Sequence, residues 1–327
     1  MKCLAFFLVM LLPFLLSFKT PTLAEGRADR IDWSRGPDVP LPRGGYFAAW
    51  HRGGLLLGGG TYWKDQKKLW TDKVSFYDPA KGIWTEREPL PRPLAYGITA
   101  LVGGKLLIMG GIDQEETLNR TIYRHSGRQW VKEGETPIGF VYATGVTVGR
   151  KIYILGGATS ASDVTTATSQ AWSFDVDKNR WEKLSDIPGP PREIHATAAN
   201  GESIYVFGGV TQEPGKAFRN LDDAHRFDTK TRTWHALRPL PQPARAFWAT
   251  SVGSSIYLLG GFGDGGLNTV YRYDPVQDTY ELFSQMPFPL MDTKFFFHDG
   301  VFYGAGGEDK LRSRFSGLLL GRMKTQQ

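Results

Sequence analysis

A pair of glycines closes a short apolar segment six times along the chain, and this repeat constrains the fold more than any other feature. The segments read LLLGG, LLIMGG, IYILGG, IYVFGG, IYLLGG and VFYGAGG. The last glycines of these pairs follow one another at intervals of 46 or 52 residues and are Gly59, Gly111, Gly157, Gly209, Gly261 and Gly307. A regular period of this length indicates one supersecondary unit repeated through the chain.

An aromatic residue recurs with the same period, at intervals of 46 to 53 residues, as Trp33, Trp84, Trp130, Trp181, Trp234 and Tyr280. Each unit runs from an apolar segment through the diglycine segment and a polar loop to a Tyr-Asp or Phe-Asp segment and then the aromatic residue. This order predicts four antiparallel strands. A period near 50 residues with a closing diglycine is typical of kelch repeats. The sequence therefore predicts an all-β, six-bladed kelch β-propeller with four-stranded antiparallel blades.

The two repeat series are out of phase at the chain ends. Gly307 has no aromatic residue in the expected place after it, whereas Trp33 has no diglycine before it. We therefore expect residues 30–35 to supply the outer strand of the last blade, which would close the ring and cover an exposed sheet edge.

The chain begins with a charged start, an apolar run from Cys3 to Phe18 and a small residue at Ala24. This pattern predicts a signal peptide over residues 1–24 and one propeller domain over residues 25–327. The alternative is a retained membrane anchor. After cleavage we expect a protein secreted across the inner membrane into the periplasm, with no membrane association.

Loss of residues 1–24 would lower the net charge from +6 to +4 and remove Cys3, the only cysteine. Because no block rich in lysine or arginine is present, the sequence does not favour a nucleic-acid partner. The six histidines show no close metal-ligand spacing, and without cysteine no thiolate site can form, so we expect no metal and no cofactor.

Basic residues recur in the proline-rich loops that join one blade to the next, as Arg43, Arg92, Arg192, Arg245 and Lys294. Such loops lie at one end of the channel, where a ring of cations could bind the carboxylate of an anionic ligand. The alternative is that these arginines belong to the repeat unit itself and bind neighbouring loops.

The loop after the sixth diglycine is short and highly charged and reads Glu308-Asp-Lys310-Leu-Arg312-Ser-Arg314. A carboxylate directly after two glycines at the channel mouth could act as a general base. The alternative is a surface ion pair of Glu308 with Lys310 or Arg312.

Three segments carry a more specific pattern than the general repeat. They are GPPREIHATAANGESIYVFGGV with NLDDAHRFDTKTRTW in blade four, LAYG before LLIMGG in blade two, and TYWKDQKKLWTDKV in blade one. These segments resemble motifs of the sialic acid mutarotases (N-acetylneuraminate epimerases), in which the blades follow in a rotated order. The chain thus resembles a cyclically permuted form of that family.

The resemblance implies the residues of a site. The family's proposed catalytic pair is a glutamate after a glycine and an arginine six residues later, in Gly-Glu-x-Lys-x-x-x-Arg. Glu308, Lys310 and Arg314 match this motif. We therefore expect Glu308 and Arg314 to be catalytic, and the following residues to bind substrate: Arg192, Tyr96, Lys310, Arg43 and Arg245.

The resemblance also implies a function, which is an isomerase that interconverts the α and β anomers of N-acetylneuraminate or of a related acidic sugar. Its partner would be that small-molecule sugar. The alternative is a non-catalytic extracytoplasmic propeller that binds a glycan or a protein, because the fold alone does not decide between chemistry and binding. Other isomerase or lyase chemistry on an acidic sugar is a third alternative.

Overall fold

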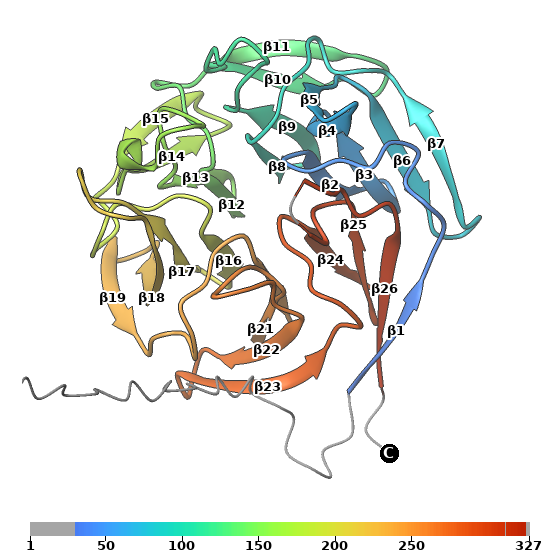
Figure 1. Cartoon of the computed structure of the whole chain (residues 1–327). Coiled ribbons are helices and arrows are strands. Elements are labelled where there is room, and N and C mark those ends of the chain that lie inside the picture. Colours follow the sequence, from blue (N-terminus) through green and yellow to red (C-terminus); the bar gives the residue numbers. More distant parts are fainter. Residues whose placement is uncertain (1–29, 311, 325–327) are drawn as a thin grey trace, which may run out of the picture.

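The computed structural model describes residues 30–310 and 312–324, which form a closed ring of six β-sheets (Figure 1). Each sheet has four antiparallel strands and forms one blade, so the predicted all-β, six-bladed kelch propeller is confirmed. The expected signal peptide lies outside the described residues. No helix in the described ranges is long and apolar enough to cross a membrane.

The blades follow the chain in order around the channel. Blade one contains β2 (Phe47–His51), β3 (Gly54–Gly58), β6 (Val74–Asp78) and β7 (Ile83–Arg87), with an added hairpin of β4 (Thr61–Lys64) and β5 (Lys67–Trp70). Blade two contains β8 (Ile98–Val102), β9 (Lys105–Met109), β10 (Thr121–His125) and β11 (Trp130–Glu135). Blade three contains β12 (Thr144–Val148), β13 (Lys151–Leu155), β14 (Ala171–Asp175) and β15 (Arg180–Lys183), with one short 3-10 helix, η1 (Val164–Thr166).

Blade four contains β16 (Ala196–Asn200), β17 (Ser203–Thr211), β18 (Arg219–Asp228) and β19 (Thr233–Leu237). Blade five contains β20 (Trp248–Val252), β21 (Ser255–Leu259), β22 (Thr269–Asp274) and β23 (Thr279–Gln285). Blade six contains β24 (Lys294–His298), β25 (Val301–Ala305), β26 (Leu318–Met323) and, from the start of the described chain, β1 (Ile31–Arg35).

The core lies between the blades, because each sheet packs one face against each of its two neighbours. Six clusters of buried apolar side chains fill the six spaces between adjacent blades. The second strand of each blade is therefore buried on both faces, and β17 is buried at every position except Ser203. This explains why the diglycine segments are continuous apolar runs in the sequence instead of alternating ones.

The aromatic repeat forms cross-strand pairs between the two outer strands. Trp181 lies opposite Phe174, with ring centroids 4.6 Å apart, and Trp234 lies opposite Phe227 at 4.9 Å. The aromatic residue of the Tyr-Asp or Phe-Asp segment is thus the partner of the next aromatic marker. Such pairs stabilise adjacent strands beyond the area that they bury.

The diglycines connect the blades to one another. The N–H of the second glycine donates to a loop carbonyl of the next blade at 2.7–2.9 Å in six bonds, Gly60 to Leu94, Gly111 to Phe140, Gly157 to Arg192, Gly209 to Ala244, Gly261 to Leu290 and Gly307 to Arg43. Both glycines of each pair have positive φ. The equivalent pair in blade one is Gly59 and Gly60, one residue later than the sequence pattern placed it, because three glycines follow one another there.

The N-terminal strand closes the ring, as predicted. β1 pairs with β26 in antiparallel register, and Trp33 lies opposite Gly321 (Figure 1). A Cβ atom at Gly321 would lie 2.4 Å from the Trp33 ring, so the indole occupies the space that a side chain would need. Ile31 is 1% exposed and packs in the cluster between blades five and six.

Closure by β1 predicts that Ile31→Ala lowers the free energy of unfolding by roughly 2–5 kcal/mol, since it leaves a cavity between two blades. Urea denaturation followed by tryptophan fluorescence measures this change. The matched control is Asp32→Ala on the outward face of the same strand, where an exposed ion pair with Lys324 contributes about 0–1 kcal/mol. Equal effects of the two substitutions would contradict the packing role of β1.

Candidate functional site

Six equivalent residues surround one end of the channel, each two positions before the first strand of a blade. We call them the mouth ring: Gly45, Tyr96, Tyr142, Ile194, Ala246 and Asp292. All six have φ between +52° and +63°. Five of them are not glycine, and a residue with a side chain rarely adopts this backbone conformation. The ring is therefore held in place by other interactions.

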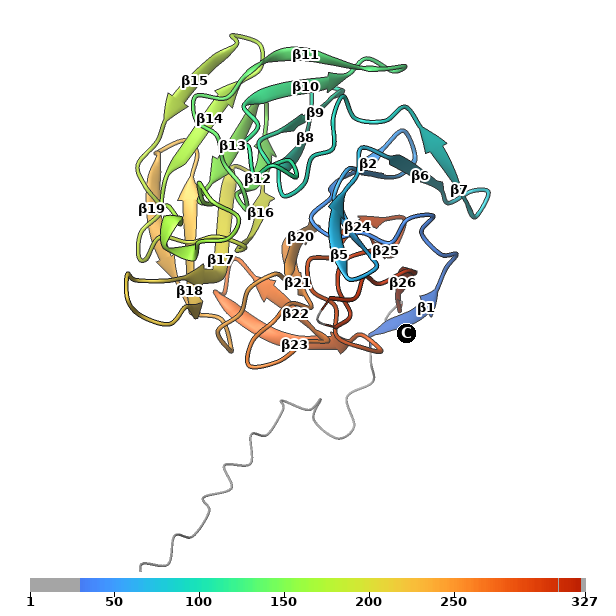
Figure 2. The ribbon, with the colours of Figure 1, turned by 45° about the horizontal axis from the view of Figure 1, so that its top comes forward.

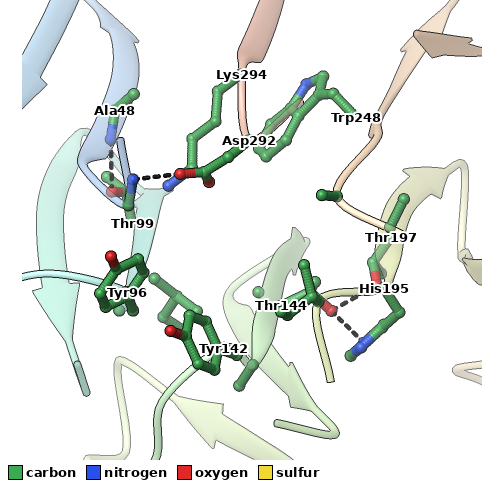
Figure 3. Close-up of a pocket in the computed structure, with 18 of the residues that line it drawn as sticks. Ala48, Tyr96, Thr99, Tyr142, Thr144, His195, Thr197, Trp248, Asp292 and Lys294 are labelled. Carbon is green, nitrogen blue, oxygen red and sulfur yellow. Dashed lines mark hydrogen bonds between the residues drawn. The ribbon is translucent and has the colours of Figure 1, made fainter. Parts of the chain in front are cut away.

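Hydrogen bonds between neighbouring blades hold the mouth ring. Each N–H donates to the carbonyl of the equivalent residue in the preceding blade over 2.6–3.2 Å, in five bonds from Tyr96, Tyr142, Ile194, Ala246 and Asp292. The sixth link differs, because Gly45 donates its N–H to the side-chain carboxylate of Asp292 (Figure 3). The carboxylate thus takes the place of a main-chain carbonyl and is part of the channel wall.

A cavity of about 120 Å³ lies inside the mouth ring and continues along the first strands (Figure 3). This space exceeds the room that one water molecule needs. Besides the ring itself, its polar lining includes Thr99, Thr144, His195, Thr197 and Lys294. The cavity is a concave feature with apolar walls and a few polar groups, around which candidate ligand-binding residues can be placed.

Burial shifts the pKa values of titratable groups that line the cavity. Burial raises the pKa of Asp292, and Lys294 and Arg314 are the largest opposing influences. Burial lowers the pKa of Lys294 to about 8, against the effect of Asp292. Burial, followed by the charge of Arg192, lowers the pKa of His195 to about 3. The imidazole of His195 is therefore neutral near pH 7, where its Nε2 hydrogen-bonds with Thr144 at 2.7 Å.

The structure brings Glu308, Arg314 and Tyr96 together at the rim of the mouth. Glu308 and Arg314 form an ion pair, and their side chains are 24% and 5% exposed. Arg314 also donates to the carbonyl of Thr61 at 3.2 Å and to its hydroxyl at 2.7 Å. The same hydroxyl lies 3.1 Å from the hydroxyl of Tyr96. A continuous polar chain thus runs from Glu308 through Arg314 and Thr61 to the mouth ring.

The main chain explains why Glu308 stands at this point. Glu308 and Met291 exchange backbone hydrogen bonds of 2.8 and 2.9 Å, and Met291 directly precedes Asp292 of the mouth ring. The residues that make the equivalent bridge in the other blades are Thr61, Ile112, Ala158, Val210 and Phe262. Glu308 is the carboxylate of this set, so a charged group stands where most blades carry an apolar one.

Arg43 and Arg192 are located differently from the expectation that they line the mouth. Both residues are fully buried. Each donates to the carbonyl of the first glycine of its own blade's pair, Arg43 to Gly59 at 3.3 Å and Arg192 to Gly208 at 3.2 Å. Arg192 also forms a two-point ion pair with Asp223 at 2.9 and 2.6 Å. These arginines therefore hold the repeat together, which was the alternative interpretation of the sequence.

The remaining predicted residues are not part of the Glu308 cluster. Lys310 is exposed, and Arg312 lies over Trp63, with its guanidinium 6.0 Å from the ring centroid. The ion pair of Glu308 with Lys310 or Arg312 that the spacing suggested is therefore not formed. Arg245 is half-buried between the rings of Phe218 and Phe262, at 5.2 and 4.7 Å, and it donates to Asn220. Within the described ranges, no group of three or more His, Cys, Asp or Glu side chains could hold a metal ion.

Sequence reasoning missed Asp292, Thr61 and Glu193. Asp292 occupies the mouth-ring position, and this position is recognised only when equivalent residues of all six blades are compared. Glu193 is 3% exposed, and its Oε2 atom has no hydrogen-bond partner among the described residues. Burial raises the pKa of Glu193 to about 7; Asp163 adds to this shift and Arg245 opposes it.

The raised pKa makes the stability of the protein depend on pH. The unfolded chain releases the Glu193 proton near pH 4.5 and the folded chain near pH 7, so the folded state binds more protons between these values. Stability should therefore fall as pH rises through this window, by up to roughly 3 kcal/mol from this group. Glu193→Gln should remove that loss, whereas exposed Glu115→Gln should not. Urea denaturation at pH 5 and pH 8 measures both, and a pH dependence unchanged by Glu193→Gln would contradict the burial of the carboxyl.

Known proteins resemble this chain in its kelch repeats and in its fold. A family model described as the KLHDC2/KLHL20/DRC7 Kelch-repeats domain matches residues 142–326. The Kelch-like protein terF of Aspergillus terreus is 26% identical over 301 residues, which cover 84% of this chain and 64% of that protein. A solved structure titled "Structure of YjhT" superposes with a TM-score of 0.67 at 18% identity and covers 73% of this chain and 84% of that one. At this identity the structural likeness shows the fold alone.

A shorter stretch is similar to a named enzyme. The N-acetylneuraminate epimerase of Yersinia enterocolitica is 35% identical over 135 residues, which cover 39% of this chain and 32% of that protein. The matches span between about a third and two thirds of the length of the curated relatives. Because the kelch-repeats model matches more than half of the chain and all six blades carry the repeat, the chain belongs to the kelch-repeat family of β-propeller proteins.

Proposed function

We propose that this chain is a mutarotase that accelerates the interconversion of the α and β anomers of N-acetylneuraminate or a related acidic sugar. The observation that carries the proposal is the ion pair of Glu308 and Arg314 at the channel mouth, joined through Thr61 to Tyr96. The partial similarity to an N-acetylneuraminate epimerase supports the choice of sugar.

The reaction needs only proton transfers. The Glu308 carboxylate removes the proton from the anomeric hydroxyl, a carbonyl forms at the anomeric carbon, and the bond from that carbon to the ring oxygen breaks. A water molecule delivers a proton to the ring oxygen. Reclosure on the other face of the carbonyl reverses each step, and Glu308 returns its proton to the new anomeric oxygen. No oxidant, reductant or cofactor is required by this balance.

Arg314 and Tyr96 have supporting roles in this proposal. Arg314 has a guanidinium fixed by Glu308 and Thr61, so it orients the carboxylate and stabilises negative charge on the anomeric oxygen. Tyr96 lines the cavity and offers its ring and hydroxyl to the sugar. We further propose that residues 1–24 are cleaved as a signal peptide and that the protein acts in the periplasm.

The first test is proton NMR of α-N-acetylneuraminate freshly released from a glycoside, with and without the protein. Faster approach to the same anomeric equilibrium would support the proposal. An unchanged rate with the folded protein would overturn it and favour a binding role.

Glu308→Gln should lower the rate of anomer exchange by roughly 10²- to 10⁴-fold, because the amide cannot accept the anomeric proton. The thermal unfolding midpoint should change little, since the amide oxygen can still accept a bond from Arg314. Glu202→Gln, in an exposed ion pair with Lys230 on the turn between β16 and β17, is the control and should keep full activity. If Glu308→Gln exchanged anomers at the original rate, Glu308 would not be the base.

A further inference from the structure

An anionic ligand at the mouth needs a cation that the protein does not already use. Arg43 and Arg192 are buried in the repeat. The guanidinium of Arg314 is bound by Glu308 and Thr61. The ammonium group of Lys294 donates a hydrogen bond to the carbonyl of Tyr46. These four groups are therefore committed to the protein itself.

The added hairpin of blade one brings a further cation to the mouth. Figure 2 shows β5 standing apart from the four strands of that blade. Lys68 lies on β5, and its ammonium nitrogen is 4.9 Å from the ring centroid of Tyr96 and 5.4 Å from that of Trp70. In residues 30–310 and 312–324, Lys68 forms no ion pair with an acidic side chain. Its ammonium group thus lies against two aromatic faces and makes no direct ion pair with a carboxylate of these residues.

The position of Lys68 links it to both the cavity and the proposed base. Tyr96, whose ring faces Lys68, lines the cavity, and its hydroxyl shares Thr61 with Arg314. Lys68 also acts on the cavity electrostatically, because its charge is among those that oppose the raised pKa of Asp292, after burial, Lys294 and Arg314. A lysine on a flexible stem can reach a ligand that sits between Tyr96 and Glu308.

Arg245 is a weaker candidate for the same role. Its guanidinium is sandwiched between Phe218 and Phe262 and bound by Asn220. Burial lowers the pKa of Arg245, and the nearby carboxyl of Glu193 opposes this shift. Lys68 lies on the Arg314 and Thr61 side of the mouth, and Arg245 does not contact that cluster.

Two classes of sugar acid differ in where the carboxylate stands relative to the anomeric carbon. In a 2-keto sugar acid, the carboxylate is attached to the anomeric carbon and lies beside the hydroxyl that the base deprotonates. In a uronic acid, the carboxylate stands across the ring from the anomeric carbon. A free cation on the same side of the mouth as Glu308 fits the first class.

We propose that the ammonium group of Lys68 binds the carboxylate of a sugar acid in which the carboxylate and the anomeric hydroxyl share one carbon. The carboxylate contact stands on the geometry of Lys68, whereas the assignment of the anomeric carbon rests on the proposed function. Arg314 is thereby left to Glu308 and the anomeric oxygen, and Lys68 is a specificity-determining residue.

The binding test uses the methyl glycoside of N-acetylneuraminate, which cannot mutarotate, and its methyl ester, which lacks the charge. Calorimetry with the full protein measures both. Lys68→Ala should weaken binding of the acid about 10- to 100-fold and leave binding of the ester within about twofold, because a bond to a charged group is lost only with the acid. Lys68→Arg should retain most of the affinity for the acid.

Matched controls separate this role from a structural one. Lys67→Ala removes an exposed cation from the adjacent position of the same strand and should change neither affinity. Equal weakening of acid and ester by Lys68→Ala would indicate a structural role of the hairpin and would overturn the proposal. Carboxylate dependence that is lost in Arg245→Ala and kept in Lys68→Ala would overturn it as well.

Kinetics with the free sugar distinguish this inference from the proposed function. With N-acetylneuraminate, Lys68→Ala should raise KM about 10- to 100-fold and leave kcat within about threefold, since the carboxylate is bound equally before and during ring opening. A wild-type protein that binds the acid through Lys68 but exchanges no anomers would refute the mutarotase and keep the carboxylate site. A methyl glucuronide that depends on Lys68 as strongly as the 2-keto acid would overturn the substrate class.

Discussion

Hydrogen bonds between neighbouring blades around the channel mouth are the interaction on which the rest of this structure depends. The diglycines form one circle of such bonds and the mouth ring forms a second, so each blade is tied to the next by main-chain atoms as well as by apolar packing. The second circle requires positive φ at six positions, five of which carry side chains. At the sixth, Gly45 allows the Tyr96 ring to lie where a Cβ atom would be only 2.2 Å from it. The wall that holds the fold together is thus also the wall of the cavity, and Asp292 belongs to both.

The basic residues of the mouth divide into two groups with different physical roles. Arg43 and Arg192 are buried, where an unpaired charge would be costly, and the terminal NH groups of each donate to carbonyl oxygens or to a carboxylate. Their planar, multiple donors suit this bridging of loops. Lys68 and Arg245 lie against aromatic rings, which lower the cost of holding a cation without neutralising it. Arg43 and Arg192 recur with the repeat and serve its structure, whereas Lys68 lies on an added hairpin outside the repeat pattern and has no ion pair within the described part of the chain.

Much of the fold could be predicted because its signals are local and repeated. Each diglycine, each aromatic marker and the mismatch between Gly307 and Trp33 indicated a blade or the closure of the ring, and the structure has the same arrangement. Glu308 and Arg314 lie in one loop and were singled out by the family resemblance, whereas spacing alone suggested an ion pair of Glu308 with Lys310 or Arg312. Thr61 and Lys68 come from the hairpin of blade one, whereas Asp292 and Glu193 come from the loops before blades six and four. Their positions at the mouth depend on how the blades are arranged around the axis.

The sequence by itself determined the number of blades, the order of strands in each blade and the strand that closes the ring. The reason is that units repeated about every fifty residues bury their apolar faces only by packing side by side. Only the tertiary structure decided which charged side chains are bound by other groups of the repeat and which have no ion pair among the described residues. Burial and partner geometry distinguish Arg192 from Lys68, and neither quantity is a property of the residue type or of its spacing. The reason is that charge is neutralised by contacts between segments distant in sequence, such as that of Arg192 with Asp223, and those contacts exist only in the folded chain.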